Sequence, residues 1–289
     1  MNKKRKFISL VLGILLLSSC SFAYQNKSID EMSTRELESY SRDLENDNKE
    51  IQTSIDEIKA YTDDKSEEEM IEMINYINTE IVKSNVMITN QSKSLFHTTA
   101  ISSGSGTIIK EDTSYYYVLT NNHVIYSLGS RSYYYIYDYL NNEYQATLLF
   151  HSPDYDLALL KFSKTRTLRV NELASENIEI GKGVIAIGQP LGQRNAITFG
   201  KALKYDTVDC STCNPDESNI QYQCVFYTAN TNNGNSGGML IDYNYKLVGV
   251  VTYGLSDARG NYMYGAGSPV AKIREFLTSN SFEVGDTNA

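Results

Sequence analysis

Three short segments of the chain carry the residue types of nucleophilic catalysis. In chain order they contain His123, the aspartates of Asp154–Leu160, and Ser236 within a Gly-Asn-Ser-Gly-Gly stretch. A serine hydroxyl is a poor nucleophile unless an adjacent base takes its proton, and that base needs a third group to hold its tautomer. The three segments supply one candidate for each of these roles.

The glycines around Ser236 have a physical reason under this interpretation. A backbone turn there directs the N–H groups of Gly234 and Ser236 at the oxygen that becomes negative in a tetrahedral intermediate, and such donors are worth about 3 kcal/mol each. The alternative is a plain turn, in which Asn and Gly are also common. A plain turn would not need histidine and aspartate segments in matching order, so we favour the oxyanion site.

These segments fall in a region that is predicted to be rich in β-strands. From Ser84 onward, short β-prone runs alternate with Gly, Asn and Asp, which is typical of a sandwich or barrel. A closing helix is expected at 270–277. Strands are expected at 85–89, 106–109, 115–120, 133–140, 144–150, 157–162, 183–187, 197–205, 225–228 and 247–253.

The motifs in this region resemble those of a known family. They are Gly104–Ile109, Leu119–Ile125, Asp156–Lys161, Ala186–Gly192, Ile197–Lys201 and Gly234–Gly238. In this order they resemble the chymotrypsin-fold serine proteases, and among them the HtrA/Deg type. The resemblance implies an all-β, two-barrel chymotrypsin-like domain over residues 84–280, preceded by an N-terminal helical extension and followed by a tail at 281–289.

The resemblance also assigns the catalytic roles residue by residue. Ser236 matches the nucleophile, His123 the general base and later general acid, and Asp156 the carboxylate that orients the imidazole. Asp154 is the rival carboxylate, and only the position directly before Leu-Ala-Leu favours Asp156. The other two histidines, His97 and His151, are expected to lie in surface loops.

Substrate-binding residues follow from the same resemblance. Thr252, Tyr253 and Gly254 match the edge strand on which these proteases dock a peptide through main-chain hydrogen bonds. Asn230, with Thr231, is expected near the base of the specificity pocket, and residues 265–268 on its wall. No acidic residue occupies these positions, so cleavage after small or medium uncharged side chains is expected.

Two departures from the family pattern qualify the resemblance. Asn235 stands where the digestive proteases have an aspartate that pairs with a newly cut amino terminus, so activation by cleavage is not expected. The chain reaches Ala289 soon after the expected closing helix. We therefore expect no peptide-binding PDZ domain, which puts the allosteric activation and the oligomeric cages of HtrA/Deg proteins in doubt.

The first 19 residues are typical of an export signal. A basic head, Lys3–Lys6, precedes an apolar run over 7–17, which is shorter than the roughly 20 residues that span a bilayer. The run closes on Leu-Ser-Ser-Cys20, which resembles a bacterial lipobox. We expect cleavage before Cys20 and a lipid on this cysteine, anchoring the protein to the outer face of a bacterial cell membrane. An ordinary secretory signal is the alternative.

Residues 20–83 form an acidic extension. Residues 21–83 hold 17 acidic and 7 basic side chains, within a whole-chain charge of −9, and no basic stripe suits nucleic acid. Capping boxes at Ser33–Glu36 and Ser66–Glu69 predict the starts of two amphipathic helices joined around residues 61–65. A spacer fits best, and a coiled coil that drives oligomerisation is the alternative.

Three cysteines, Cys210, Cys213 and Cys224, lie within 15 residues. Outside the cytoplasm such clustering favours a local disulfide, and we expect Cys210 or Cys213 to pair with Cys224. A zinc site is the alternative, but with no histidine nearby it lacks a fourth good ligand. The loop they occupy is a local insertion expected near the active face.

Together these features predict a lipid-anchored extracytoplasmic serine endopeptidase. It would need no metal or organic cofactor, and its substrates would be unfolded or surface-displayed proteins or peptides. A dedicated processing protease with one partner is an alternative on the same fold. A catalytically silent lipoprotein that binds peptides or host proteins is the alternative from another class. A structural spacer protein is a third, but it leaves the large domain unexplained.

Overall fold

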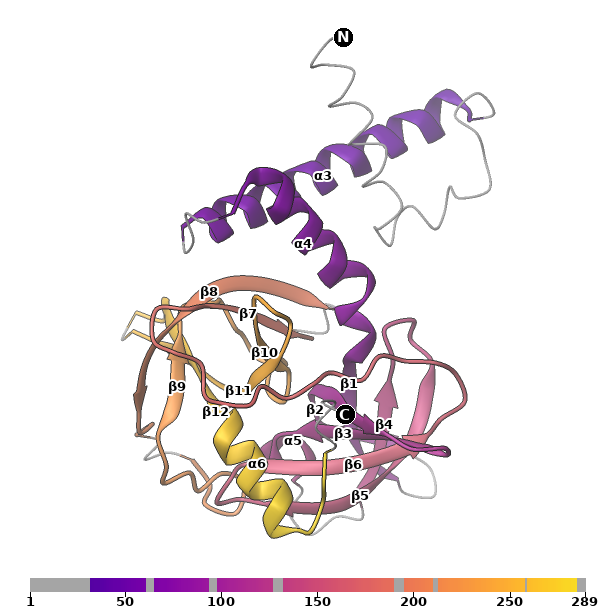
Figure 1. Cartoon of the computed structure of the whole chain (residues 1–289). Helices are drawn as coiled ribbons and strands as arrows, with labels where there is room; N and C mark the ends of the chain where they lie inside the picture. The colour runs from indigo at the N-terminus through magenta and orange to yellow at the C-terminus, as the bar shows by residue number, and fades with distance from the viewer. Residues whose placement is uncertain are drawn as a thin grey trace. The chain divides into compact units, whose positions relative to one another are not determined.

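The chain divides into two compact units, Met1–Thr79 and Glu80–Ala289. The structure is a computed structural model, and it describes residues 32–60, 65–93, 98–126, 132–189, 195–209, 213–257 and 259–284. Figure 1 colours the chain from the helices of the first unit to the strands of the second. No helix among these described residues combines the length and apolarity needed to cross a bilayer.

Two helices make up the described part of the first unit. Helix α3 (Thr34–Lys59) begins with the expected capping box, in which Ser33 and Glu36 bond to each other's backbone N–H groups. Helix α4 (Glu67–Thr79) follows Ser66, whose N–H donates to Glu69 at 2.7 Å. Ile55 and Ile58 are buried in α3, and four apolar residues are buried in α4. Both predicted helix starts are confirmed.

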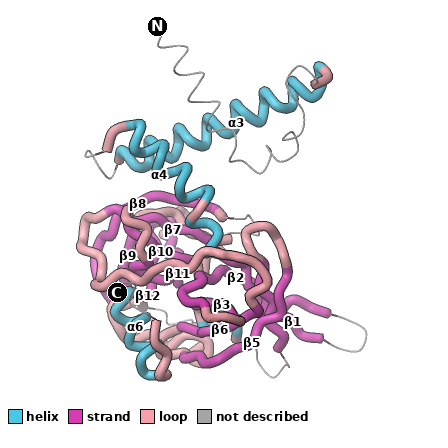
Figure 2. Tube along the Cα trace, turned by 45° about the vertical axis from the view of Figure 1, so that its right-hand side comes forward, coloured by secondary structure: helices cyan, strands magenta, loops and turns pink. Residues whose placement is uncertain are grey.

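The second unit is built from two closed antiparallel barrels of six strands each. A 3-10 helix, η2 (Ile81–Ser84), leads into the first barrel. Figure 2 shows the strands of this unit in magenta. The first barrel contains, in spatial order, β1 (Asn85–Lys93), β2 (Thr98–Glu111), β3 (Tyr115–Thr120), β6 (Leu157–Ser163), β5 (Glu143–Ser152) and β4 (Ser132–Tyr137). The expected all-β, two-barrel fold is confirmed.

The second barrel is completed by two strands that the sequence analysis did not expect. Its spatial order is β10 (Met239–Asp242), β11 (Leu247–Ser256), β12 (Tyr262–Pro269), β9 (Cys224–Tyr227), β8 (Ala196–Asp206) and β7 (Gly183–Gly188). The missed strands are β10 and β12. The expected closing helix is α6 (Val270–Ser279), whose Phe276 ring packs on Phe150 of β5. Helix α6 therefore starts in the second barrel and contacts the first.

Each barrel has its own apolar core. Ile88, Ile108 and Phe162 are fully or almost fully buried in the first barrel, and Val184, Val225 and Leu240 in the second. Side chains that alternate inward along the strands produce these two cores.

Ser105 of β2 joins the two barrels. Its N–H donates to the Ser236 carbonyl at 2.8 Å, and its hydroxyl donates to the Gly234 carbonyl at 2.7 Å. The same hydroxyl accepts the Gln189 N–H at 2.9 Å. Strand β2 of the first barrel therefore holds the turn that carries Ser236.

Candidate active site

His123 sits on the short helix α5 (Asn122–Ile125), directly after β3. Its backbone N–H donates to Asp156 Oδ1 at 3.0 Å, and its ring Nδ1 lies 2.8 Å from Asp156 Oδ2. The carboxylate can only accept, so Nδ1 carries the proton and Nε2 is left free to take one. The His123 side chain keeps 25% exposure, whereas that of Asp156 has none. The pair therefore presents one basic nitrogen toward solvent.

Four influences set the pKa of His123. Burial of the ring lowers it, but the charge of Asp156, the hydrogen bond to Asp156 and the charge of Glu217 all raise it. The net result is a pKa above the ordinary value for histidine. His123 is thus a stronger base than a free imidazole.

The structure separates the two rival carboxylates. Asp156 turns inward with φ 46°, a left-handed conformation that aspartate tolerates, and its N–H bonds to Pro153 at 3.1 Å. Asn121 fastens the same residue by donating its amide to the Asp156 carbonyl at 2.8 Å. Asp154 is exposed and accepts from the Asn219 amide at 2.7 Å. Only Asp156 lies at His123.

His151 does not join this arrangement. It is exposed, but it lies near the end of strand β5 and not in the expected loop, and its Nδ1 lies 2.7 Å from the side-chain oxygen of Asn122. His97 lies outside the described residues.

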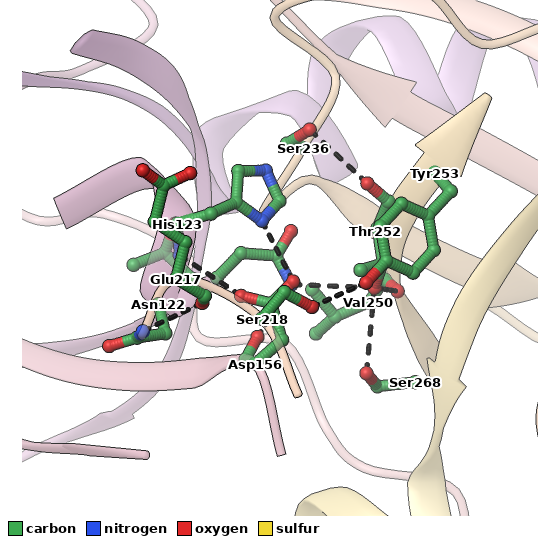
Figure 3. A network of polar contacts seen from close by, with 12 residues as sticks. Asn122, His123, Asp156, Glu217, Ser218, Ser236, Val250, Thr252, Tyr253 and Ser268 are labelled. Carbon is green, nitrogen blue, oxygen red and sulfur yellow. Dashed lines mark hydrogen bonds and ion pairs between the residues drawn. The ribbon is translucent and has the colours of Figure 1, made fainter. Parts of the chain in front are cut away.

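Ser236 faces the same cavity as His123. Its hydroxyl donates to the Thr252 carbonyl at 3.4 Å, and no hydrogen bond to His123 is present among the described residues (Figure 3). Catalytic hydrogen bonds are often long or poorly aligned without substrate and tighten in the complex. A rotation about the Cα–Cβ bond of Ser236 is the change that would redirect the hydroxyl.

The turn before Ser236 is held by a series of backbone bonds. Asn235 N–H donates to Asn232 at 2.9 Å, and Gly237 N–H donates to Val251 at 2.9 Å. Gly234 has φ 100°, which suits glycine. The N–H groups of Gly234 and Ser236 donate to no acceptor among the described residues. Two neighbouring donors are therefore available for an oxyanion.

A cavity of about 560 Å³ runs past Ser236. The predicted substrate-binding residues Asn230, Thr252, Tyr253 and Gly254 all line it. The wall expected at 265–268 is formed instead by Tyr262, whose hydroxyl donates to the Ala229 carbonyl at 2.5 Å. The reason is packing, because Gly265 lies directly on the ring of Tyr227.

The connection between β8 and β9 also lines the cavity, through Cys213, Asn214, Glu217 and Ser218. The sequence predicts that this insertion lies near the active face, but only its cysteines stand out in the sequence as candidate site residues. An acidic residue directly before a serine carries no signal of its own.

The expected disulfide to Cys224 is wrong. Cys213 is disulfide-bonded, whereas Cys224 is a free, buried thiol. Cys224 begins β9 and packs with Phe226 and Ala266, so its sulfur belongs to the apolar side of the barrel wall. Cys210 lies outside the described residues, as does Cys20. No three potential metal ligands gather among the residues that the structure describes.

Comparison with known proteins extends these observations. Residues 104–250 match the trypsin-like peptidase domain family. The chain is 32% identical over 158 residues to the serine protease Do-like HtrA of Bacillus subtilis, covering 54% of this chain and 34% of that protein. It is 31% identical over 185 residues to the periplasmic serine endoprotease DegP of Salmonella typhimurium, covering 63% and 36%.

The chain spans about a third of the length of these curated relatives. The family match covers about half of this chain and includes His123, Asp156 and Ser236. It also runs through both barrels, from β2 to β11. The chain therefore belongs to the trypsin-like peptidase domain family.

Proposed function

We propose that this protein is a serine endopeptidase that hydrolyses peptide bonds through an acyl-enzyme. The observation that carries the proposal is the buried Asp156 carboxylate bonded to His123, whose ring shares a cavity with Ser236. Membership of the trypsin-like peptidase domain family and the similarity to HtrA and DegP proteins support it.

The proposed reaction begins when His123 Nε2 takes the proton of the Ser236 hydroxyl. The serine oxygen attacks the substrate carbonyl, and the N–H groups of Gly234 and Ser236 stabilise the oxygen that becomes negative. His123 then gives its proton to the leaving amine, which frees the new amino terminus. Water, activated by the same imidazole, attacks the ester and releases the acid. Asp156 stabilises the imidazolium throughout.

Covalent labelling tests this proposal without knowledge of a substrate. A fluorophosphonate probe reacts with a serine only when a base and an oxyanion site activate it. We expect the native protein to be labelled on Ser236, and Ser236→Ala and His123→Ala to remain unlabelled. Ser256→Ala is the matched control, because Ser256 lines the same cavity but has no hydrogen bond to a histidine among the described residues.

Absence of labelling in the folded native protein would contradict the proposal. A folded native protein that takes up no probe, as judged by intact mass, is not an active hydrolase under those conditions. The catalytically silent peptide-binding lipoprotein then becomes the better account. The hydroxyl of Ser236, which bonds to Thr252 and not to His123, is the observation that favours this second candidate.

We also propose that the protein is exported and held at the outer face of the bacterial cell membrane by a lipid on Cys20. The basic head, the apolar run over 7–17 and Leu-Ser-Ser-Cys support this proposal, as do the relatives described as periplasmic. Metabolic labelling with a fatty-acid analogue should mark the native protein and leave Cys20→Ser unmarked. Equal labelling of both proteins would refute the anchor.

The proposed substrates are unfolded or surface-displayed proteins, and the acidic helical segment is proposed as a spacer. Its charge and the two capped helices support a solvated extension. Sedimentation of the soluble mature chain separates the alternatives. A monomer agrees with a spacer, whereas a stable oligomer that dissociates on deletion of residues 21–79 indicates a coiled coil.

A further inference from the structure

The β8–β9 connection is fastened to both barrels beside the cavity. On the side of the first barrel, the Asn122 amide donates to the Glu217 carbonyl at 2.7 Å, and Asn219 N–H donates to the Pro153 carbonyl at 2.8 Å. On the side of the second barrel, the Ser218 and Tyr253 hydroxyls bond to each other. Glu217 therefore has a backbone whose place is fixed relative to the site.

The side chain of Glu217 brings an uncompensated negative charge to this cavity. It is half-buried, and its carboxylate accepts only a 3.3 Å bond from Asn214 among the described residues. Within that part of the chain no lysine or arginine lies at ion-pair distance from it. Its charge contributes to the raised pKa of His123, and Figure 3 shows its carboxylate on the His123 side of the site. No cationic side chain of the described residues therefore neutralises this carboxylate.

An extended substrate would meet Glu217 with one particular side chain. A peptide that pairs with the edge strand at Thr252–Gly254 has side chains that alternate between opposite sides. In such a pose, the residue whose carbonyl lies at Ser236 would point to the end of the cavity lined by Asn230. The residue just before it would point the other way, toward His123, Tyr253 and Glu217, which line the same cavity. This second subsite is the one that carries the charge.

We propose that Glu217 selects lysine or arginine at the substrate residue immediately before the one whose carbonyl is cleaved. The carboxylate would pair with the cationic head, while the Tyr253 ring would cover the methylene stem. The proposal rests on the proposed endopeptidase function and adds its substrate class. Among the described residues that line the cavity, Glu217 is the only acid, so the subsite at Asn230 is expected to have a different preference.

Cleavage mapping of a mixed peptide library tests the preference. The products are identified by mass spectrometry. For the native protein, Lys and Arg should be enriched at the residue immediately before the one whose carbonyl is cleaved, and Glu217→Gln should show no such enrichment. For a matched peptide pair with Lys or Gln there, kcat/KM should favour Lys about threefold to tenfold, a range typical of a partly exposed charge pair. High salt should reduce this ratio.

The control variant is Asp216→Asn, which removes the same charge one residue away. Asp216 is exposed and does not line the cavity, so the Lys preference should persist. All rates are measured at a pH above the pKa of His123, because loss of the Glu217 charge also changes the pKa of His123. If Glu217→Gln alters the Lys and Gln peptides equally, or if the native library shows no Lys or Arg enrichment, the inference is wrong.

A binding experiment separates this inference from the proposed activity. Fluorescence anisotropy with Ser236→Ala compares the Lys and Gln peptides without cleavage, and the preference should vanish in Ser236→Ala/Glu217→Gln. If the protein binds the Lys peptide more tightly but the native protein cleaves neither peptide, the proposed endopeptidase activity is wrong and the proposed Glu217 subsite stands. If the native protein cleaves peptides but neither cleavage nor binding shows a Lys preference, the proposed Glu217 subsite is wrong and the proposed endopeptidase activity stands.

Discussion

At the scale of single residues, the site depends on how one buried carboxylate is used. Asp156 gives both of its oxygens to His123, one to the ring and one to the backbone N–H. Orientation of the ring and placement of α5 are therefore set by the same group. The motif order in the sequence predicted which residues would meet. Spacing alone left Asp154 and Asp156 open, because the two-residue alternation of a strand would put both on one side. The left-handed turn at Asp156 separates them in the structure.

The raised pKa of His123 predicts a pH profile. The base must be neutral to accept a proton, so kcat/KM should rise with pH through a midpoint above 6.5, the ordinary value. Asp156→Asn should move this midpoint downward, since the charge that raises it is gone. It should also lower kcat by about 10⁴-fold, because the tautomer is no longer fixed. Cleavage rates of one peptide between roughly pH 5 and 9, the range in which histidine titrates, check both effects.

At the scale of elements, the strands were predictable where they follow an apolar alternation. Of the six runs expected for the first barrel, 115–120, 144–150 and 157–162 agree with the observed strands within two residues at both ends, whereas 106–109 covers only the last part of β2. Strand β12 was missed because three of its eight residues are Gly265, Gly267 and Pro269, which are unfavourable in strands by propensity. Strand β10 was missed because it is only four residues long. The cavity-lining role of Glu217 had no local pattern, since it depends on where a long connection docks.

Strand β2 carries a further element-scale prediction through Ser105. Its hydroxyl bonds to the Gly234 carbonyl and the Gln189 N–H, so Ser105→Ala frees the peptide that precedes the oxyanion donor. We expect the rate of fluorophosphonate labelling to fall about tenfold to a hundredfold, since one such donor is worth about 3 kcal/mol.

The matched control is Ser103→Ala on the same strand, because Ser103 is exposed. Its labelling rate should equal that of the native protein. If Ser105→Ala labels at the native rate while remaining folded, the bonds across the two barrels do not hold the oxyanion turn.

At the scale of the whole molecule, the two units differ in what they contribute. Every residue assigned to the site lies in Glu80–Ala289, and each barrel of that unit has its own core. A protein that begins at Glu80 should therefore fold and be labelled at the native rate. Circular dichroism and labelling kinetics check this together. Loss of β-structure on removing the first unit would show that the barrels depend on it.

The free thiol of Cys224 at the start of β9 can report on local opening of the second barrel. Burial raises the pKa of Cys224 to about 12, and only a thiolate reacts with alkylating reagents. In the closed second barrel this sulfur should stay unmodified for as long as the wall holds. The rate at which a reagent alkylates Cys224 therefore measures how often the second barrel opens. This measurement does not depend on any chemistry at the active site.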